Sequence, residues 1–178
     1  MPGVIVCLTG ESADRVRRLW EAAKAEFGAP LAPPAAIPHI SLEVASTADL
    51  EKLGPSLKAI ACSTAPFRVR TTGFGVFTGE PLVLYLSVVR TSRLALLQRV
   101  VHQETAGAWS GPVEHFRPDN WMPHITIAMQ DLTVERLAAV MPWLARQDLS
   151  FDVPIDNLAV GEDTPDGHRI LASYPLEG

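Results

Sequence analysis

Cysteine is scarce in this sequence, and its scarcity excludes several kinds of site. The 178 residues include only two cysteines, Cys7 and Cys62. Neither has the close spacing of a zinc-binding or redox pair, and two thiols at unrelated positions do not make a disulfide framework. We therefore expect two free thiols and no thiolate-bound metal.

Basic residues and long apolar runs are also few. The chain has 15 Lys and Arg against 20 Asp and Glu, a net charge of −5, whereas a grip on long nucleic acid draws on clustered cations. A small phosphorylated ligand or the end of an RNA needs only a few. No apolar run reaches membrane length, and the first one lacks the basic lead-in of a secretory signal. We expect a cytoplasmic monomer with no membrane association.

Hydrophobic periodicity predicts alternating strands and helices in one globular domain, since 47% of the residues are hydrophobic and 20% charged. The predicted strands are 4–9, 39–45, 67–77, 82–88, 124–129, 149–162 and 168–176. The predicted helices are 13–27, 48–62, 91–107 and 133–147. Ser12 and Thr47 are predicted helix caps, and Gly107 a helix stop. Proline is expected to break or kink the helices at Pro55 and Pro142.

Loops and turns separate these elements. Proline is frequent at 29–38, a loop is predicted at 108–123, and a turn at 163–167 joins the last two strands as a hairpin. The order β-α-β-α-β then occurs twice, roughly over 1–79 and 80–178, with one extra strand. We interpret this as an internal duplication in a single α+β domain, with two mainly antiparallel sheets around a central cleft and helices outside.

A short motif marks the same place in each half. "PHISLEV" spans 38–44 and "PHITIAM" spans 123–129. Side chains alternate along a strand, so His39 and Ser41 share one face, as do His124 and Thr126. If the halves face each other, the two pairs converge on one cleft. Either histidine alone is most simply a strand residue, but their repetition in matching context favours a catalytic pair.

Two histidines and two hydroxyls suit the cleavage of a phosphodiester without a metal. One base must deprotonate the attacking oxygen, one acid must protonate the leaving oxygen, and donors must hold the non-bridging oxygens. Histidine fits both proton-transfer roles because its pKa lies near neutral pH. No carboxylate or cysteine stands at ligand spacing around His115, so we expect no metal there and no cofactor.

The sequence also resembles a known family, the 2H phosphoesterase superfamily, and within it the bacterial 2′-5′ RNA ligase-like or cyclic nucleotide phosphodiesterase branch. The resemblance rests on "HISL", "TTGFGVFTGEPLVLYLSV" and "FRPDNWMPHITIA" and spans nearly the whole chain. It implies a bilobal α+β fold and metal-independent opening of 2′,3′-cyclic phosphates of nucleotides or RNA ends. His39 and His124 would be the acid and base, in an order left open, and Ser41 and Thr126 would hold the phosphate oxygens.

Two positions depart from the family pattern. Many members carry arginine five positions after the second histidine, where this chain has Met129. A substitute cation is expected from Arg68, Arg70 or Arg117. Glu43 is expected on the cleft face by alternation, paired with an arginine or orienting the imidazole.

Two aromatic residues are further candidates for the binding site, and two further histidines are not. Trp121 and Tyr85 are candidates for stacking a nucleobase, although aromatic residues beside strands are more often core. His102 and His168 are expected to be solvated. Three alternatives stay open: another cyclic or ADP-ribose-derived phosphate or the reverse 2′-5′ ligation as the reaction, a nucleotide-binding module without turnover, and a structural protein.

Overall fold

The computed structural model of the protein describes residues 1–28, 31–129, 132–165 and 167–178. Parts of the predicted loop 29–38 and of the predicted turn 163–167 lie outside these ranges. The strands are β1 (Pro2–Cys7), β2 (His39–Ala48), β3 (Phe67–Phe77), β4 (Val83–Val88), β5 (Trp109–Pro112), β6 (His124–Ala128), β7 (Asp152–Ile155), β8 (Asn157–Thr164) and β9 (Gly167–Pro175). The helices are α1 (Gly10–Phe27), α2 (Leu50–Ser63), α3 (Ser92–Glu104) and α4 (Val134–Leu144), with short 3-10 turns η1 (Ala106–Ala108) and η2 (Glu114–Phe116).

Within the described ranges the strands form two antiparallel sheets, so the predicted α+β class is confirmed. The five-stranded sheet has the order β5-β2-β1-β8-β9, and the four-stranded sheet has the order β6-β4-β3-β7. Each sheet takes strands from both sequence halves. β3 leaves the first half to pair with β4, and β8 leaves the second half to pair with β1. In each sheet the strand with the histidine motif pairs with the first strand of its own half, which in turn pairs with a strand from the other half. This succession is β2-β1-β8 in one sheet and β6-β4-β3 in the other. The boundary between 79 and 80 stays a prediction.

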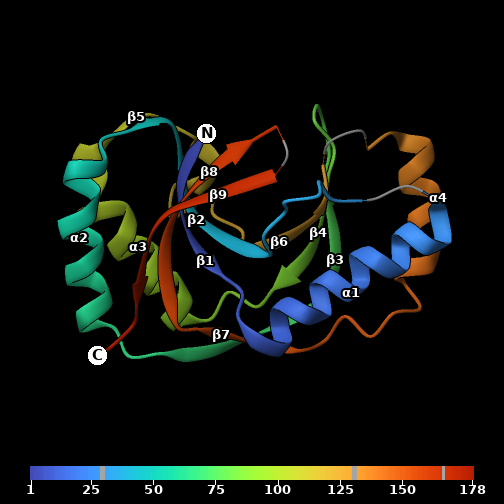
Figure 1. Cartoon of the computed structure of the whole chain (residues 1–178), viewed down its shortest axis with the longest axis horizontal. Helices are drawn as coiled ribbons and strands as arrows, with labels where there is room; N and C mark the ends of the chain where they lie inside the picture. The colour runs from blue at the N-terminus through green and yellow to red at the C-terminus, as the bar shows by residue number, and fades with distance from the viewer. Residues whose placement is uncertain (29–30, 130–131, 166) are drawn as a thin grey trace.

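α2 and α3 lie at one end of the molecule and α4 at the other, and α1 runs from near the middle toward α4 (Figure 1). α2 packs on β8 and β9, and α3 packs on β2, so both cover the five-stranded sheet. α1 contacts β7 of the four-stranded sheet. The ring of Phe27 on α1 meets that of Trp143 on α4 edge to face at 5.7 Å. This arrangement leaves the region between the sheets for the motif strands.

Two predicted helix starts are wrong. α1 begins after Thr9, and the Ser12 hydroxyl donates to the Thr9 carbonyl oxygen instead of capping the helix. α2 is capped by Asp49, whose carboxylate accepts a hydrogen bond from the Lys52 backbone. The predicted cap Thr47 belongs to β2, because that strand runs further than its apolar pattern indicates. A hydrophilic strand end and a helix cap use the same residue types, so sequence alone does not separate them.

The other helix limits follow the sequence more closely. Thr91, the first residue of the predicted helix 91–107, caps α3, but α3 ends at Glu104, before the glycine expected to stop it. Pro55 and Pro142 both lie inside continuous helices, so neither breaks its helix. Each proline costs its helix one i→i−4 hydrogen bond, and the remaining backbone bonds keep the helix continuous.

The predicted loop 108–123 contains β5, which extends the five-stranded sheet. β5 is only four residues long and pairs with the distal end of β2, where Thr47 opposes Ser110. A short edge strand containing Gly111 and Pro112 gives no periodic signal.

None of the described helices is long and apolar enough to cross a membrane.

Candidate active site

The two histidine motifs lie on neighbouring strands from different sheets. β2 carries His39 and Ser41, and β6 carries His124 and Thr126 at the edge of its sheet. The two strands contact each other, and the indole nitrogen of Trp121 donates a hydrogen bond of 2.9 Å to the Ser41 carbonyl oxygen. All four motif side chains line one cavity of about 750 Å³.

Both imidazoles are held in the same way. The Nδ1 atom of His39 lies 2.7 Å from the carbonyl oxygen of Ile37, and Nδ1 of His124 lies 2.7 Å from that of Met122. A carbonyl oxygen only accepts, so each Nδ1 must carry a hydrogen. In the neutral ring, Nε2 is then the basic nitrogen. Each motif thus fixes its own tautomer through the residue two positions earlier.

The motif hydroxyls lie on the cavity side of their strands. Ile40 and Ile125, which point the other way, are fully buried in the core. Within the described part of the chain, the Ser41 and Thr126 hydroxyls have no hydrogen-bond partner, although both line the cavity. Both hydroxyls can therefore donate to an oxygen atom of a ligand.

Burial makes both motif histidines weak bases. It lowers the pKa of His39 from 6.5 to about 4, and the nearby charges of His168 and His124 act in the same direction. The bond to Ile37 and the carboxylate of Asp163 oppose this shift. Burial also lowers the pKa of His124, against the opposing bond to Met122. A charge on His124 thus bears on the pKa of His39, which lies in the same cavity.

An aromatic cluster supports His124. Its ring meets Phe77 edge to face at 5.0 Å and lies 5.4 Å from the ring of Tyr85, which stacks on Phe77 at 4.2 Å. Tyr85 lies across Gly75, where an added Cβ would come within 2.5 Å of the phenol oxygen. Glycine at this position lets the tyrosine ring cover the strand and reach His124.

A third histidine lies beside His39, where the sequence analysis expected a solvated side chain. His168 belongs to β9, and its ring meets that of His39 at 4.6 Å and an interplanar angle of 74°. Its side chain is 23% exposed. The prediction is wrong because His168 and His39 are more than a hundred residues apart, and no local pattern indicates that their strands bring them together.

Glu43 lies on the core side of β2, so its predicted place on the cleft face is wrong. Ser41 pairs with Ile5 but Glu43 pairs with Val4, so β2 has one extra residue between them. Such a bulge reverses the alternation of faces. The Glu43 side chain is 1% exposed, and its Oε2 lies 2.5 Å from Nδ1 of His102 on α3. His102, which was also expected to be solvated, is its partner in place of an arginine.

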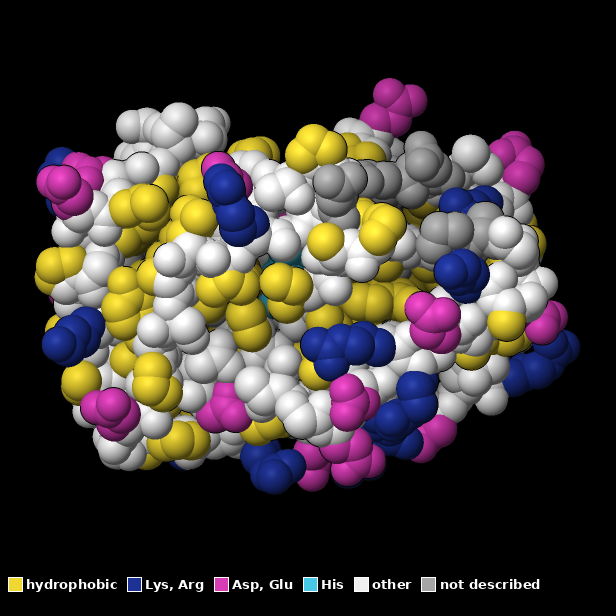
Figure 2. Space-filling view, in the orientation of Figure 1, with side chains coloured by type: hydrophobic (Ala, Val, Ile, Leu, Met, Phe, Trp, Pro, Cys, Tyr) yellow, Lys and Arg dark blue, Asp and Glu magenta, His cyan; other side chains and the backbone are white. Residues whose placement is uncertain are grey.

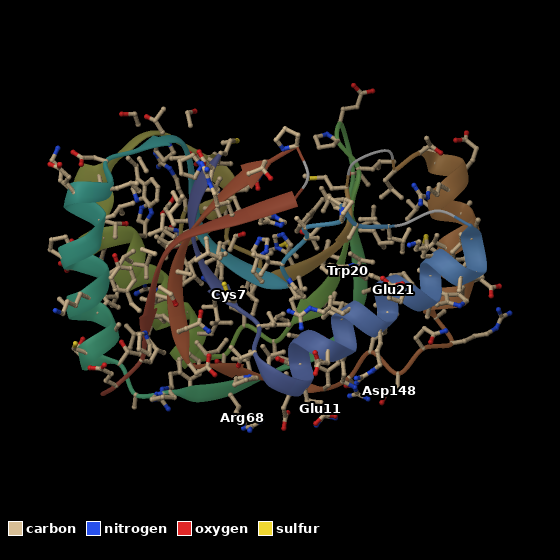
Figure 3. The ribbon with its side chains drawn as sticks, viewed as in Figure 1. Cys7, Glu11, Trp20, Glu21, Arg68 and Asp148 are labelled. Carbon is tan, nitrogen blue, oxygen red and sulfur yellow. The ribbon has the colours of Figure 1, made fainter. Side chains whose placement is uncertain are left out.

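The predicted arginines do not line this cavity. Arg68 and Arg70 lie at a second cavity of about 490 Å³ beside the start of α1. Figure 3 shows Arg68 at the lower edge of the molecule, near Glu11 and pointing away from the centre. Arg117 is exposed and pairs with Glu114 at 2.8 Å. None of the three is therefore placed to neutralise a phosphate between the motif histidines.

The two predicted stacking residues are almost fully buried and contact residues of the two motifs. Trp121 lines the cavity but is only 2% exposed, and its indole nitrogen is used by Ser41. Tyr85 is 8% exposed and packs between Phe77 and His124. Phe77 and Trp20 also line the cavity and were not predicted as site residues. Their aromatic type was the only signal available, and core residues share it.

The cavity wall is mostly apolar and carries no lysine or arginine among its described residues. Its carboxylates are Glu80 and Asp163. Figure 2 shows a histidine in a hollow near the centre of one face, bordered mainly by hydrophobic side chains. The described residues also contain no group of three His, Cys, Asp or Glu side chains suited to hold a metal ion. A protonated imidazole is thus the positive group that this wall can offer to an anion.

Comparison with curated proteins finds relatives of similar size. A protein of Geobacillus kaustophilus named "Putative phosphoesterase" is 31% identical over 122 residues, which are 67% of this chain and 66% of that protein. A Bacillus mycoides protein of the same name is 33% identical over the same shares. The chain thus matches just under two-thirds of the length of these relatives.

Solved structures share the fold. A Thermus thermophilus protein superposes with a TM-score of 0.65 at 20% identity, over 99% of this chain and 98% of that one. LigT of Escherichia coli, crystallised with 3′-AMP, superposes with a TM-score of 0.60 at 17% identity over the same shares. The sequence model of the family described as the 2′-5′ RNA ligase superfamily matches residues 11–166 of this chain. The predicted resemblance is therefore confirmed, and the chain belongs to the 2′-5′ RNA ligase superfamily of 2H phosphoesterases.

Proposed function

We propose that the chain is a metal-independent phosphodiesterase that opens 2′,3′-cyclic phosphates of nucleotides or of RNA ends. The observation that carries the proposal is the matched pair of imidazoles on β2 and β6, each with Nδ1 bound to backbone and Nε2 left for chemistry. Beside each imidazole in the same cavity stands a hydroxyl, on Ser41 and Thr126.

The reaction divides between these four groups. One neutral imidazole takes a proton from water through Nε2, and the resulting hydroxide attacks the phosphorus. The other imidazole, protonated at Nε2, gives its proton to the ribose oxygen that leaves on the opposite side. The two hydroxyls donate to the non-bridging oxygens, where negative charge is held. The product is a phosphomonoester, and exchange of protons with water restores the starting pair.

The cavity suits the cyclic phosphate end of a substrate, which is small and carries a single negative charge. Its volume of about 750 Å³ lies in the range of small-molecule sites, and a cyclic phosphodiester carries one charge. An ADP-ribose-derived phosphate adds a diphosphate, which the carboxylates of Glu80 and Asp163 would repel. Phe77 and Trp20 on the wall offer apolar surface to a nucleoside. The complex of the structural neighbour LigT with 3′-AMP is compatible with a nucleotide in such a cleft.

Product analysis tests the proposal directly. Wild-type protein in EDTA is incubated with 2′,3′-cyclic nucleotides, a cyclic-phosphate-ended oligonucleotide and an ADP-ribose-derived cyclic phosphate, and products are followed by phosphorus NMR. We expect ring opening of the first two substrates, and little of the third. The double variant His39→Ala/His124→Ala is the matched blank.

Two results would contradict the proposal. Absence of turnover on all substrates would leave the cleft as a binding site, which a raised melting temperature with nucleotides would then reveal. Loss of turnover in EDTA that added metal restores would mean that a metal takes part in the reaction.

A further inference from the structure

The first residues of β9 hold the chain segment that precedes His39. The backbone N–H of His168 donates to the carbonyl oxygen of Ala35 at 3.1 Å. Gly167 makes this approach possible, because an added Cβ would lie 2.4 Å from the Ala35 carbonyl carbon and its φ is +139°. β9 and the loop before β2 are therefore joined at close range.

The His168 side chain extends this connection to the motif histidine. The N–H of Ile37 donates to Nδ1 of His168 at 3.3 Å, while the carbonyl oxygen of Ile37 accepts from Nδ1 of His39 at 2.7 Å. His168 and His39 are thus linked through the backbone of Ile37. The His168 imidazole accepts from the Ile37 N–H, and the His39 imidazole donates to the Ile37 carbonyl oxygen. The His168 ring also packs against the His39 ring at 4.6 Å.

We propose that His168 is a positioning residue for His39, which it serves by holding Ile37 in the orientation that fixes the His39 tautomer. The inference rests on the proposed function for its effect on turnover, but its effect on the His39 ring is independent of any substrate. His168 touches neither the phosphate nor the attacking water in this role.

The two motif histidines differ in this respect. Among the described residues, the ring of His124 packs against Phe77 and Tyr85, which carry no charge that responds to mild acid. The ring of His39 packs instead against the imidazole of His168. His39, unlike His124, thus packs against a group that can itself become positive in acid. We infer from this difference that His39 is the base and His124 the acid.

Protonation of His168 would disrupt the arrangement. A neutral His168 that accepts at Nδ1 carries its hydrogen on Nε2, which lies 3.6 Å from Oδ1 of Asp163. A second hydrogen would have to go on Nδ1, where it would oppose the N–H of Ile37. The charged groups that face His168 are His39 on β2, Asp163 on β8, and the Met1 amino group, which contacts Asp163 at 3.3 Å. Asp163 alone favours the proton, and it is shared with Met1.

Three variants separate positioning from packing. His168→Asn keeps an acceptor near the place of Nδ1 but takes up no proton, whereas His168→Leu keeps bulk and removes the acceptor. Arg169→Ala is the matched control, since Arg169 is the next residue of β9 and bonds to Glu162 on the surface. We expect His168→Leu to lower kcat by about 10- to 100-fold with little change in KM, because a catalytic group is misplaced. His168→Asn should stay within about 5-fold of wild type, and Arg169→Ala should not change kcat.

Two further readouts respond to positioning specifically. The acid limb of kcat/KM should depend on two protons in the wild type and on one in His168→Asn. Nitrogen NMR of the imidazoles, which needs no turnover, should show His39 in the Nδ1–H tautomer in the wild type and in His168→Asn, and in mixed tautomers in His168→Leu.

The NMR result keeps this inference distinct from the proposed function. If the wild type opens no cyclic phosphate, the proposed function fails, and the tautomer of His39 still decides the role of His168. An unchanged tautomer in His168→Leu overturns the inference. So does equal loss of kcat in folded His168→Asn and His168→Leu, because the acceptor would then not matter.

Discussion

Nδ1 of His39 and Nδ1 of His124 each lie 2.7 Å from the carbonyl oxygen of the residue two positions earlier, although the two histidines belong to different sheets. The bond is local to each motif, so neither ring depends on the other for its tautomer. Both rings therefore offer Nε2 to the same cavity without any rearrangement.

Replacing either motif histidine should abolish most of the turnover. We expect His39→Ala and His124→Ala each to lower kcat by about 10²- to 10⁴-fold, the usual contribution of general acid or base catalysis. The double variant should be little worse than either single variant, since acid and base act as a unit. Steady-state kinetics measure this, and circular dichroism checks that the fold persists. Activity within 10-fold of wild type in either single variant would contradict the two-histidine mechanism.

The pH profile of kcat/KM should have its maximum below pH 6.5. The base must be neutral, so activity rises as pH increases through the pKa of His39, which burial lowers to about 4. The acid must be protonated, so activity falls as pH increases through the pKa of His124, which burial holds below 6.5. The profile of kcat should lie at higher pH, because a bound anion favours imidazolium. A kcat/KM maximum on the alkaline side of neutrality would be inconsistent with these environments.

Removing the partner of Glu43 should destabilise the protein in a pH-dependent way. In His102→Ala a 1% exposed carboxylate loses its partner, and we expect a loss of about 1–3 kcal/mol in the free energy of unfolding at pH 8. Burial raises the pKa of Glu43 above 4.5, with the His102 bond opposing it. The folded variant therefore binds a proton that the unfolded chain releases, so the loss should shrink as pH falls from 8 toward 5.

Urea denaturation at both pH values measures the effect on Glu43. The double variant Glu43→Gln/His102→Ala is the control, because it buries no charge and its stability should not follow pH in this way. An equal loss at both pH values in His102→Ala would show that packing, rather than the carboxylate, accounts for the destabilisation.

A cation at position 129 should strengthen phosphate binding. Met129 lines the cavity and is 40% exposed, so an arginine can reach the anion while staying in contact with solvent. We expect Met129→Arg to lower KM for a cyclic phosphate by about 2- to 5-fold at low salt, as a solvent-exposed ion pair allows. The gain should disappear at high ionic strength. Met129→Gln controls for shape, and a salt-independent change in KM would argue against a direct charge contact.

The sequence predicted the features that depend on local pattern. Alternation placed His39 with Ser41, and His124 with Thr126, on one face of each strand, and in the structure these faces line the cavity while Ile40 and Ile125 lie in the core. The repeated succession of strands and helices predicted the α+β class and two antiparallel sheets. Cytoplasmic location and the monomeric state stay predictions.

The sequence did not predict features that depend on one inserted residue or on distant strands. The bulge in β2 turned Glu43 away from the cleft, and nothing in "HISLEV" marks the extra residue. His168 meets His39 only because β8 crosses to pair with β1 and brings β9 with it. Arg68 and Arg70 lie on the same face of β3, as strand alternation predicts, but that face lines the second cavity and not the one with the motif histidines.

The exchange of β3 and β8 between the sequence halves has a consequence for how the molecule can assemble. A fragment ending before β4 would contain β1, β2 and β3, but β3 would have neither of its neighbours, and β1 would lack β8 on its open edge. Unpaired strand edges of this kind favour association with other chains. Each wall of the cleft therefore becomes complete only when the last strands of the chain are in place. Folding must accordingly bring together residues far apart in sequence, which is slow compared with local pairing.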